Sequence, residues 1–316
     1  MVRVIGVPLD YCGRQEGSRM GPAALRLAGL VESLKKIVES VDDAGDIPIP
    51  PIVDGPSGFK HFGTFDTVAQ ALKRTVGDAL DAQHTPVVLG GDHAIAVGSV
   101  SAALHRFPDE LAVLWIDAHA DVNTPGTSPS GNLHGMPLGA LLRLESGTTG
   151  TKDLQWRKLL SDVVPPTSLR AERIAWLGLR DIDRDEAKSL LALKPQFIAT
   201  MHDVDRFGIV DVMGRFDHWM QSAGATKLWV SFDVDSLDPV LAPGTGTAVR
   251  GGLTYRESHL CAELLRELLD SPLCPYSLAG LDVVETNPLL DTNNMTAVAA
   301  VEWIASLFGK TILGKR

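Results

Sequence analysis

Short apolar runs, most of which end in acidic or histidine side chains, limit the fold of this chain more than any other feature. The runs are rich in Val, Ile and Leu, and they lie at Val2 to Val7, Pro86 to Leu89, Leu111 to Ile116, Ile174 to Leu179, Leu228 to Phe232 and Leu278 to Val284. None shows the strict alternation of apolar and polar residues that is typical of a strand with one solvent-exposed face. Each run therefore predicts a strand that is buried on both faces, as in a parallel sheet covered by helices.

Longer segments with helical spacing lie between these strands. Asp66 to Gln83 carries an apolar residue at every fourth position, and Met295 to Phe308 is another such segment, which Gly309 ends. Thr254 to Asp270 opens with Thr254 and Glu257, the pair expected of a capping box. Strands that alternate with helices predict an α/β fold, here a three-layer αβα sandwich around a mostly parallel sheet.

No stretch of the sequence has the composition of a linker between domains. Gly147 to Arg173 is mixed in composition and carries Pro165-Pro166, so we interpret it as an insertion. A chain of 316 residues is long enough to bury one large core. We therefore expect a single domain over residues 1–316.

Charge and cysteine content exclude several classes of protein. The net charge of −10 argues against a nucleic-acid or anionic-membrane surface, where a basic patch is expected. Three widely separated cysteines suit a reducing compartment better than a disulfide framework. No apolar run is long enough to cross a bilayer, and the start of the chain lacks the apolar stretch of a signal peptide. We expect a cytoplasmic protein that binds neither nucleic acid nor membrane.

Acidic and histidine side chains follow five of the predicted strands. Asp92-His93 follows the second strand in the sequence, the DAHAD segment with Asp117, His119 and Asp121 follows the third, and further acids follow the others: Asp181, Asp183, Asp233, Asp235 and Glu285. In open α/β sheets the ligand crevice lies beyond the carboxyl ends of the strands. These side chains are therefore expected to meet at one edge of the sheet.

The spacing of these residues points to metal ions. Extended residues at i, i+2 and i+4 face the same side, so Asp117, His119 and Asp121 can converge, and so can Asp233 and Asp235. Four clustered carboxylates repel one another, and two divalent cations would balance their charge. Four Asp and two His without a thiolate suit manganese better than zinc or copper, although nickel, cobalt or iron could use the same ligands. Any one of these residues alone could equally be a helix N-cap or a turn former.

The motifs around these residues resemble those of the ureohydrolase family, and of its arginases in particular. The matching segments are GGDH at Gly90 to His93, DAHADVNTP at Asp117 to Pro125, SGNLHG at Ser130 to Gly135, GLRDID at Gly178 to Asp183, SFDVDSLDP at Ser231 to Pro239, GTGT at Gly244 to Thr247, GGLTYRE at Gly251 to Glu257 and GLDVVETNP at Gly280 to Pro288. The resemblance covers nearly the whole chain in the family's order. It implies an arginase-like fold.

The resemblance also implies a set of ligands and catalytic residues. One Mn2+ would be held by His93, Asp117, Asp121 and Asp233, and the second by His119, Asp117, Asp233 and Asp235. In the family a hydroxide bridges the two metals and attacks the guanidinium carbon, which releases urea. Metal-bound water has a pKa near ~7, so hydroxide is available to attack an otherwise poor electrophile. We expect Glu285 to orient the guanidinium, His134 to move a proton to the leaving amine, and Asp121 to belong to the catalytic set.

The loop after the DAHAD segment bears on the choice of guanidino substrate. Asn123, Ser130 and Asn132 match arginase positions that bind the α-carboxylate, and Asp183 matches the position that recognises the α-amino group. Further expected contacts are Glu186, on the amino side, and Thr247, close to the guanidinium pocket. These residues favour L-arginine, with L-ornithine and urea as products, over agmatine, which lacks a carboxylate.

Several alternatives stay open at this point. Agmatine, guanidinobutyrate or another guanidino acid could be the substrate, because the metal motifs are shared among relatives and Asn, Ser and Gly also favour turns. Ala94 and Ala248 replace the Ser and Pro that are common in the family, and the loss of that proline could loosen the loop of Thr247. A deacetylase or amidase with one metal, or an inactive binding subunit, could use a similar scaffold. The resemblance further implies a homo-oligomer, either a trimer or a hexamer.

Overall fold

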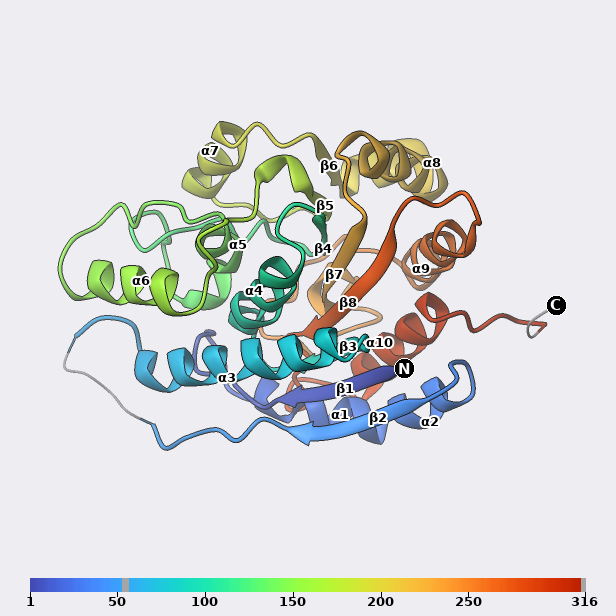
Figure 1. Ribbon diagram of the computed structural model, residues 1–316, viewed down its shortest axis with the longest axis horizontal. Coiled ribbons are helices and arrows are strands. Elements are labelled where there is room, and N and C mark those ends of the chain that lie inside the picture. The colour runs from blue at the N-terminus through green and yellow to red at the C-terminus, as the bar shows by residue number, and fades with distance from the viewer. Residues whose placement is uncertain (53–56, 314–316) are drawn as a thin grey trace.

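The centre of the molecule is one eight-stranded sheet with the strand order β2-β1-β3-β8-β7-β4-β5-β6 (Figure 1). The structure, a computed structural model, describes residues 1–52 and 57–313. The strands are β1 (Val2–Val7), β2 (Val41–Asp46), β3 (Thr85–Gly90), β4 (Leu111–Ile116), β5 (Ile174–Leu179), β6 (Phe197–Thr200), β7 (Lys227–Asp233) and β8 (Ser277–Val284). All seven strand pairings are parallel, which confirms the predicted parallel sheet.

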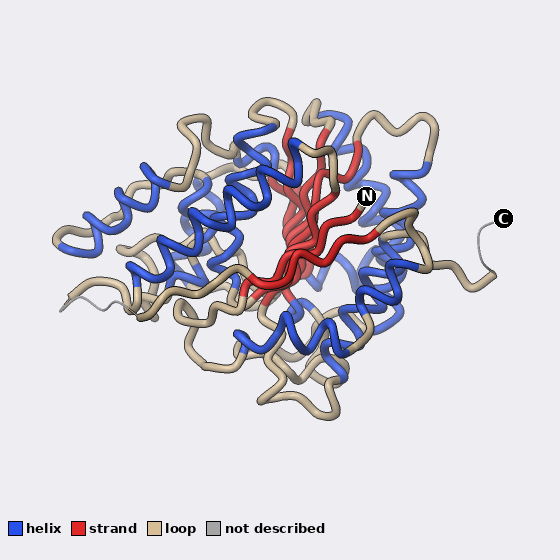
Figure 2. The backbone as a smooth tube through the Cα atoms, turned by 60° about the horizontal axis from the view of Figure 1, so that its bottom comes forward, coloured by secondary structure: helices blue, strands red, loops and turns tan. Residues whose placement is uncertain are grey.

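Helices cover both faces of the sheet (Figure 2). They are α1 (Gly21–Leu27), α2 (Leu30–Lys35), α3 (Phe62–Asp81), α4 (Ala96–Arg106), α5 (Pro137–Leu141), α6 (Thr151–Asp162), α7 (Arg184–Ala192), α8 (Met201–Ser222), α9 (Tyr255–Asp270) and α10 (Met295–Leu307). One core cluster contains residues of α1, α2, α8, α9 and α10, and the other contains residues of α3 to α7. The three-layer αβα sandwich is therefore confirmed.

Strand β4 shows why these sequences form central strands. Its six residues are all buried. Ala112, Leu114 and Ile116 belong to one core cluster, whereas Leu111, Val113 and Trp115 belong to the other. Successive side chains of a strand point to opposite faces, so a run that is apolar throughout can stabilise both layers.

The helices follow the sequence signals closely. Thr254 is the N-cap of α9, and its capping box with Glu257 is formed, with Thr254 N donating to Glu257 Oε2 over 2.9 Å. The segment Gly147 to Arg173, interpreted as an insertion, contains α6 between α5 and β5. Among the described residues, no helix is both long and apolar enough to cross a membrane.

The strand order places the predicted site at the middle of the sheet. β3, β8, β7, β4 and β5 are consecutive neighbours. They are also the five strands whose carboxyl ends lead into the acidic and histidine residues singled out above. Parallel strands end at the same edge, so the five sets of side chains meet at one place.

Candidate metal centre and active site

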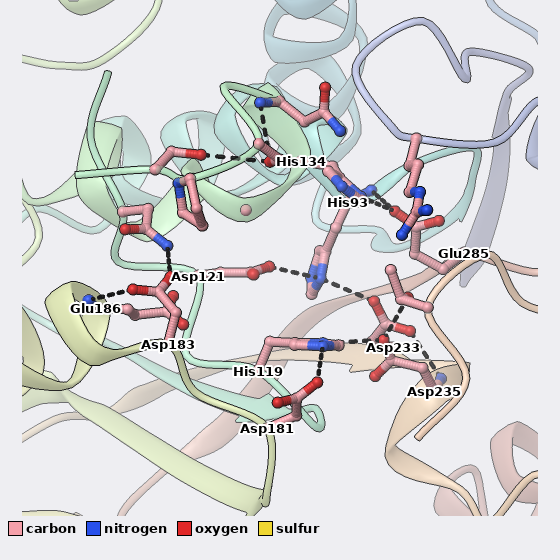
Figure 3. A pocket seen from close by; sticks show the side chains of 18 residues that line it. His93, His119, Asp121, His134, Asp181, Asp183, Glu186, Asp233, Asp235 and Glu285 are labelled. Atoms are coloured by element: carbon pink, nitrogen blue, oxygen red, sulfur yellow. Dashed lines mark hydrogen bonds and ion pairs between the residues drawn. The ribbon is translucent and has the colours of Figure 1, made fainter. Parts of the chain in front are cut away.

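A small pocket of about 270 Å³ opens at the carboxyl ends of these five strands (Figure 3). Of the predicted site residues, all but Asp117 line it, namely His93, His119, Asp121, Asn123, Ser130, Asn132, His134, Asp183, Glu186, Asp233, Asp235, Thr247 and Glu285. Asp117 is buried beneath them and contacts both His93 and His119. The structure therefore brings the whole predicted set into one site of small-molecule size.

His93 lies among three carboxylates. Its Nδ1 is 3.1 Å from Oδ2 of Asp117, Asp121 and Asp233, and all four side chains are buried. Nδ1 makes no hydrogen bond of acceptable geometry with any of them. Two ligand atoms at right angles around an ion with ~2.2 Å bonds would lie ~3.1 Å apart, so the observed spacing suits candidate ligands of a metal as well as an ion pair.

A second group adjoins the first. His119 Nδ1 lies 3.1 Å from Asp235 Oδ2 and 3.3 Å from Asp117 Oδ1. The His93, Asp117 and Asp233 set and the Asp117, His119 and Asp235 set each hold ligand atoms within 4.8 Å of one another. Asp117 belongs to both groups and turns one oxygen toward each. These residues are candidate ligands for a metal.

The backbone that brings these residues together differs from the prediction. β4 ends at Ile116, Asp121 has a left-handed φ of 54°, and Val234–Ser236 form the 3-10 turn η5. Asp117 and Asp233 each accept a hydrogen bond from the amide two residues later, at 2.7 Å and 2.8 Å. The side chains converge as predicted. The extended backbone invoked for this holds only for Asp233, which ends β7, because the other ligands after β4 and β7 lie in tight turns.

The electrostatics of the cluster also favour a cation. Burial, followed by the charges of Asp235 and Asp117, raises the pKa of Asp233 well above its ordinary value. Burial and the charge of Asp117 raise the pKa of Asp121 to about 6. Buried carboxylates this close together are stable as anions only beside positive charge, which divalent ions would supply.

His134, which is partly buried, pairs with the buried Glu285. His134 Nδ1 lies 3.0 Å from Glu285 Oε1, which also accepts a 2.9 Å hydrogen bond from the His93 amide. Burial opposes the charge on His134, but the hydrogen bond and charge of Glu285 outweigh it and raise the pKa of His134 to about 9. His134 is therefore a cation near neutral pH. Glu285 itself has a left-handed φ of 63°, at the turn that follows β8.

The residues predicted to contact substrate lie in the pocket wall, and several are bonded to one another. Asn123 Nδ2 donates to Asp183 Oδ2 over 2.9 Å, and Asn123 Oδ1 accepts from Thr127 over 2.8 Å. Asp183 also caps α7 through the amides of Asp185 and Glu186. Burial raises the pKa of Glu186 to about 8, although the carboxylate accepts a bond from the Val122 amide.

Contacts on both sides of Ala248 hold the loop of Thr247. Thr247 Oγ1 donates to Asp235 Oδ2 over 2.7 Å. On the other side, Arg180 Nη2 donates to the Val249 carbonyl over 2.8 Å. The loop is therefore tied to the acidic cluster although position 248 is not proline.

Comparison with known proteins identifies the group to which this site belongs. The model of the arginase family matches residues 1–309. The chain belongs to the arginase family. An arginase from Staphylococcus aureus strain MRSA252 is 39% identical over 319 aligned residues, which cover 99% of this chain and 98% of that protein.

Solved structures agree. The arginase from Bacillus caldovelox, in its native structure, is 37% identical in sequence to this chain and superposes with a TM-score of 0.87. The match covers 98% of this chain and 99% of that protein. An arginase from Entamoeba histolytica in complex with L-ornithine is 27% identical, has a TM-score of 0.84, and 98% of each chain is covered. Family, relatives and fold together show that this arginase-family chain is a hydrolase of the arginase type.

The structure adds residues that the sequence analysis missed. Ser231 Oγ lies 2.9 Å from His93 Nε2 and donates to Asp282 Oδ1, so a hydrogen-bonded chain leads from His93 into the core. Asp282 is fully buried, and it also accepts 2.8 Å bonds from Ser99 Oγ and Trp229 Nε1. A lone acid within the apolar run LAGLDVV is the signal that could have revealed it.

Arg180 is a second missed residue. Its guanidinium donates to five backbone carbonyls, those of Gly178, Asp235, Ser236, Leu237 and Val249. Burial lowers its pKa, and nearby carboxylates, with Asp235 first, oppose that shift. Arg180 thus ties β5 to the turn that carries Asp235, and no spacing rule in the sequence predicts such a contact.

Proposed function

We propose that this chain is a binuclear manganese hydrolase that cleaves the guanidinium group of L-arginine to L-ornithine and urea. The observation that carries the proposal is the pair of adjoining ligand groups that share Asp117 at the base of a small pocket. Relatives named arginase along the full length support it, as does the E. histolytica arginase that was solved with L-ornithine. A single sheet that contributes to both cores supports one ureohydrolase domain over residues 1–316.

Manganese fits the donor set of this site. One ion would be held by His93, Asp117, Asp121 and Asp233, and the other by His119, Asp117, Asp233 and Asp235. Hard carboxylate oxygens with two imidazoles and no thiolate suit Mn2+. When bound, two such ions would neutralise the four carboxylates and supply ionised water as a nucleophile near neutral pH.

The residues of the chain orient the substrate and move the proton. Glu285 faces the pocket and would pair with the guanidinium, which fixes the reacting carbon in place. His134 uses Nδ1 to contact Glu285, which leaves Nε2 to carry a transferable proton. When the C–N bond breaks, the departing amine of ornithine needs a proton, and the cationic His134 would donate it.

The far end of arginine would lie against the wall of the pocket. Asp183 and Glu186 would receive the α-ammonium group, and Asn123, Ser130 and Asn132 would face the α-carboxylate. Thr247, held on Asp235, would border the guanidinium. Against agmatine these groups would lose a partner. Asn123 is buried, Asn132 is half-buried and Ser130 is exposed, so the cost for each group is at most the roughly 1–3 kcal/mol of a buried unpaired group.

Urea release from L-arginine and from agmatine, measured in parallel after incubation with Mn2+, tests the proposal. We expect rapid urea release from L-arginine and at least about tenfold lower kcat/KM for agmatine. Preference for agmatine would leave a ureohydrolase that acts on another guanidino compound. Absence of urea from both substrates would refute the proposed reaction.

A further inference from the structure

Acidic side chains dominate the pocket. Seven line it, namely Asp121, Asp181, Asp183, Glu186, Asp233, Asp235 and Glu285. Two divalent cations would balance the four carboxylates of the ligand set, but Asp181, Asp183 and Glu285 lie outside that set. Glu186 also lies outside it, but its raised pKa of about 8 leaves it largely protonated near neutral pH. Such a field favours the guanidinium and the α-ammonium group of a substrate and repels a carboxylate.

Neutral donors for a substrate carboxylate are few. The Asn123 side chain donates one of its two Nδ2 protons to Asp183, and its Oδ1 accepts from Thr127, so one proton of the amide remains for a ligand. Ser130 Oγ accepts a hydrogen bond from the backbone amide of Asn132 over 3.2 Å and lies 3.4 Å from Ser128 Oγ. An unpaired cation at the mouth of the pocket would add to these neutral donors and oppose the repulsion of a substrate carboxylate.

Among the described residues that line the pocket, Arg14 is the one arginine or lysine. It is exposed, and within residues 1–52 and 57–313 it takes part in no ion pair. Arg19, in the 3-10 turn Ser18–Met20 that follows, is by contrast held by Asp10 at 2.8 Å. The guanidinium of Arg14 is therefore available to a ligand.

The loop that presents Arg14 is fixed on both sides. The Cys12 amide donates to Asp92 over 2.8 Å, and the Cys12 carbonyl accepts from the His134 amide over 3.2 Å. Beyond Arg14, the Glu16 carbonyl accepts from Asn287 Nδ2 over 3.1 Å. Arg14 thus lies at the tip of a short turn between two anchored residues.

The residues next to Arg14 show which walls it joins. A β-carbon built on Gly13 would lie 3.6 Å from His134 Nδ1. On the other side, a β-carbon built on Gly246 would lie 3.6 Å from Gln15 Cβ. The turn therefore bridges the loop of His134 and the loop of Thr247 at the opening of the pocket.

From this placement we infer that Arg14 is a specificity-determining residue that selects guanidino substrates with a carboxylate at the end remote from the guanidinium. The inference rests on the proposed function and deepens it, since it names the charge that separates arginine-like substrates from agmatine-like ones. A guanidinium can bind a carboxylate through two parallel hydrogen bonds. Unlike the charge of His134, which is paired with Glu285, the positive charge of Arg14 is not already paired with a carboxylate of the protein.

The test uses the manganese-loaded full chain and two pairs of ligands that differ only by the carboxylate. The first pair is L-arginine and agmatine, compared by kcat/KM for urea release. The second is L-ornithine and putrescine, compared by calorimetric titration, which needs no turnover. Arg14→Ala and Arg14→Lys are measured with Arg250→Ala, which removes an exposed arginine from a neighbouring loop outside the pocket lining.

Arg14→Ala should lower kcat/KM for L-arginine and the affinity for L-ornithine by about tenfold, and should leave agmatine and putrescine unchanged or improved. Arg14→Lys should restore part of the preference, and Arg250→Ala should leave it intact. Equal effects on both members of each pair, or no effect, would overturn the inference while the proposed function stands. A wild-type chain that releases urea from neither substrate would refute the proposed function, and the ornithine and putrescine affinities would still decide the role of Arg14.

Discussion

Replacing Asp282 with asparagine should weaken metal binding at His93, although Asp282 reaches His93 only through the hydroxyl of Ser231. Ser231 Oγ donates to Asp282 Oδ1 and must therefore accept from His93 Nε2, 2.9 Å away. Nε2 then carries the proton, and Nδ1, which faces the three carboxylates, keeps its lone pair for a metal.

Asparagine at position 282 reverses this order. Trp229 Nε1 can only donate, so the amide oxygen of the new residue must face Trp229 and its NH2 group must face Ser231. Ser231 would then accept from the amide and donate to His93 Nε2. That arrangement requires a proton on Nδ1, which competes with the metal.

The expected cost is about 10- to 100-fold in Mn2+ affinity, or about 1.4–2.8 kcal/mol. Competition with a chelating indicator dye measures it, and urea unfolding of the metal-free protein monitors the fold. Ser99→Ala is the matched control, since it removes another donor to Asp282 without entering the path to His93. An Asp282→Asn variant that folds normally and binds Mn2+ as tightly as the wild type would refute this reasoning.

Other predictions concern Arg180, the metal ions and Asp117. Arg180→Met should lower the free energy of unfolding by about 2–3 kcal/mol in urea titrations, because backbone carbonyls lose their hydrogen-bond donor. A decrease below ~0.5 kcal/mol would show that these hydrogen bonds do not stabilise the fold. Removing metal with a chelator should lower the melting temperature by about 5 °C or more, because the clustered carboxylates lose their counter-ions. An unchanged melting temperature would contradict the claim that cations stabilise this cluster. Asp117→Asn should abolish binding of both ions, because each ligand group includes Asp117, and metal analysis that finds one retained ion would count against that assignment.

The central strands could be predicted from sequence, but the edge strands could not. β1, β4 and β5 have the predicted bounds, because strands buried on both faces are almost entirely apolar, and Arg3 of β1 is the one charged residue of the three. β2 has the sequence VDDAGD and no buried residue, and β6 has only four residues. Both lie at the edges of the sheet, where one side lacks a neighbour and the apolar signal is weak.

The acidic residues of the site could be predicted from their positions after the strands, whereas the hydrogen bonds that hold the site residues in place could not. Parallel strands must end at one edge, so acids directly after apolar runs had to meet. The bond between Ser231 and Asp282 depends on the register of β7 and β8, in which these two residues are partners. The Asn123 contact with Asp183 joins two loops 60 residues apart, and neither register nor loop path follows from local spacing.

The number of manganese ions that activity requires tests the central claim most directly. Metal-free protein would be titrated with Mn2+, with bound ion per chain measured by equilibrium dialysis and urea release from L-arginine measured at each point. We predict two bound ions per chain, with full activity reached only as the second is taken up. Saturation and full activity at one ion per chain would contradict the binuclear centre and favour a hydrolase that uses one metal.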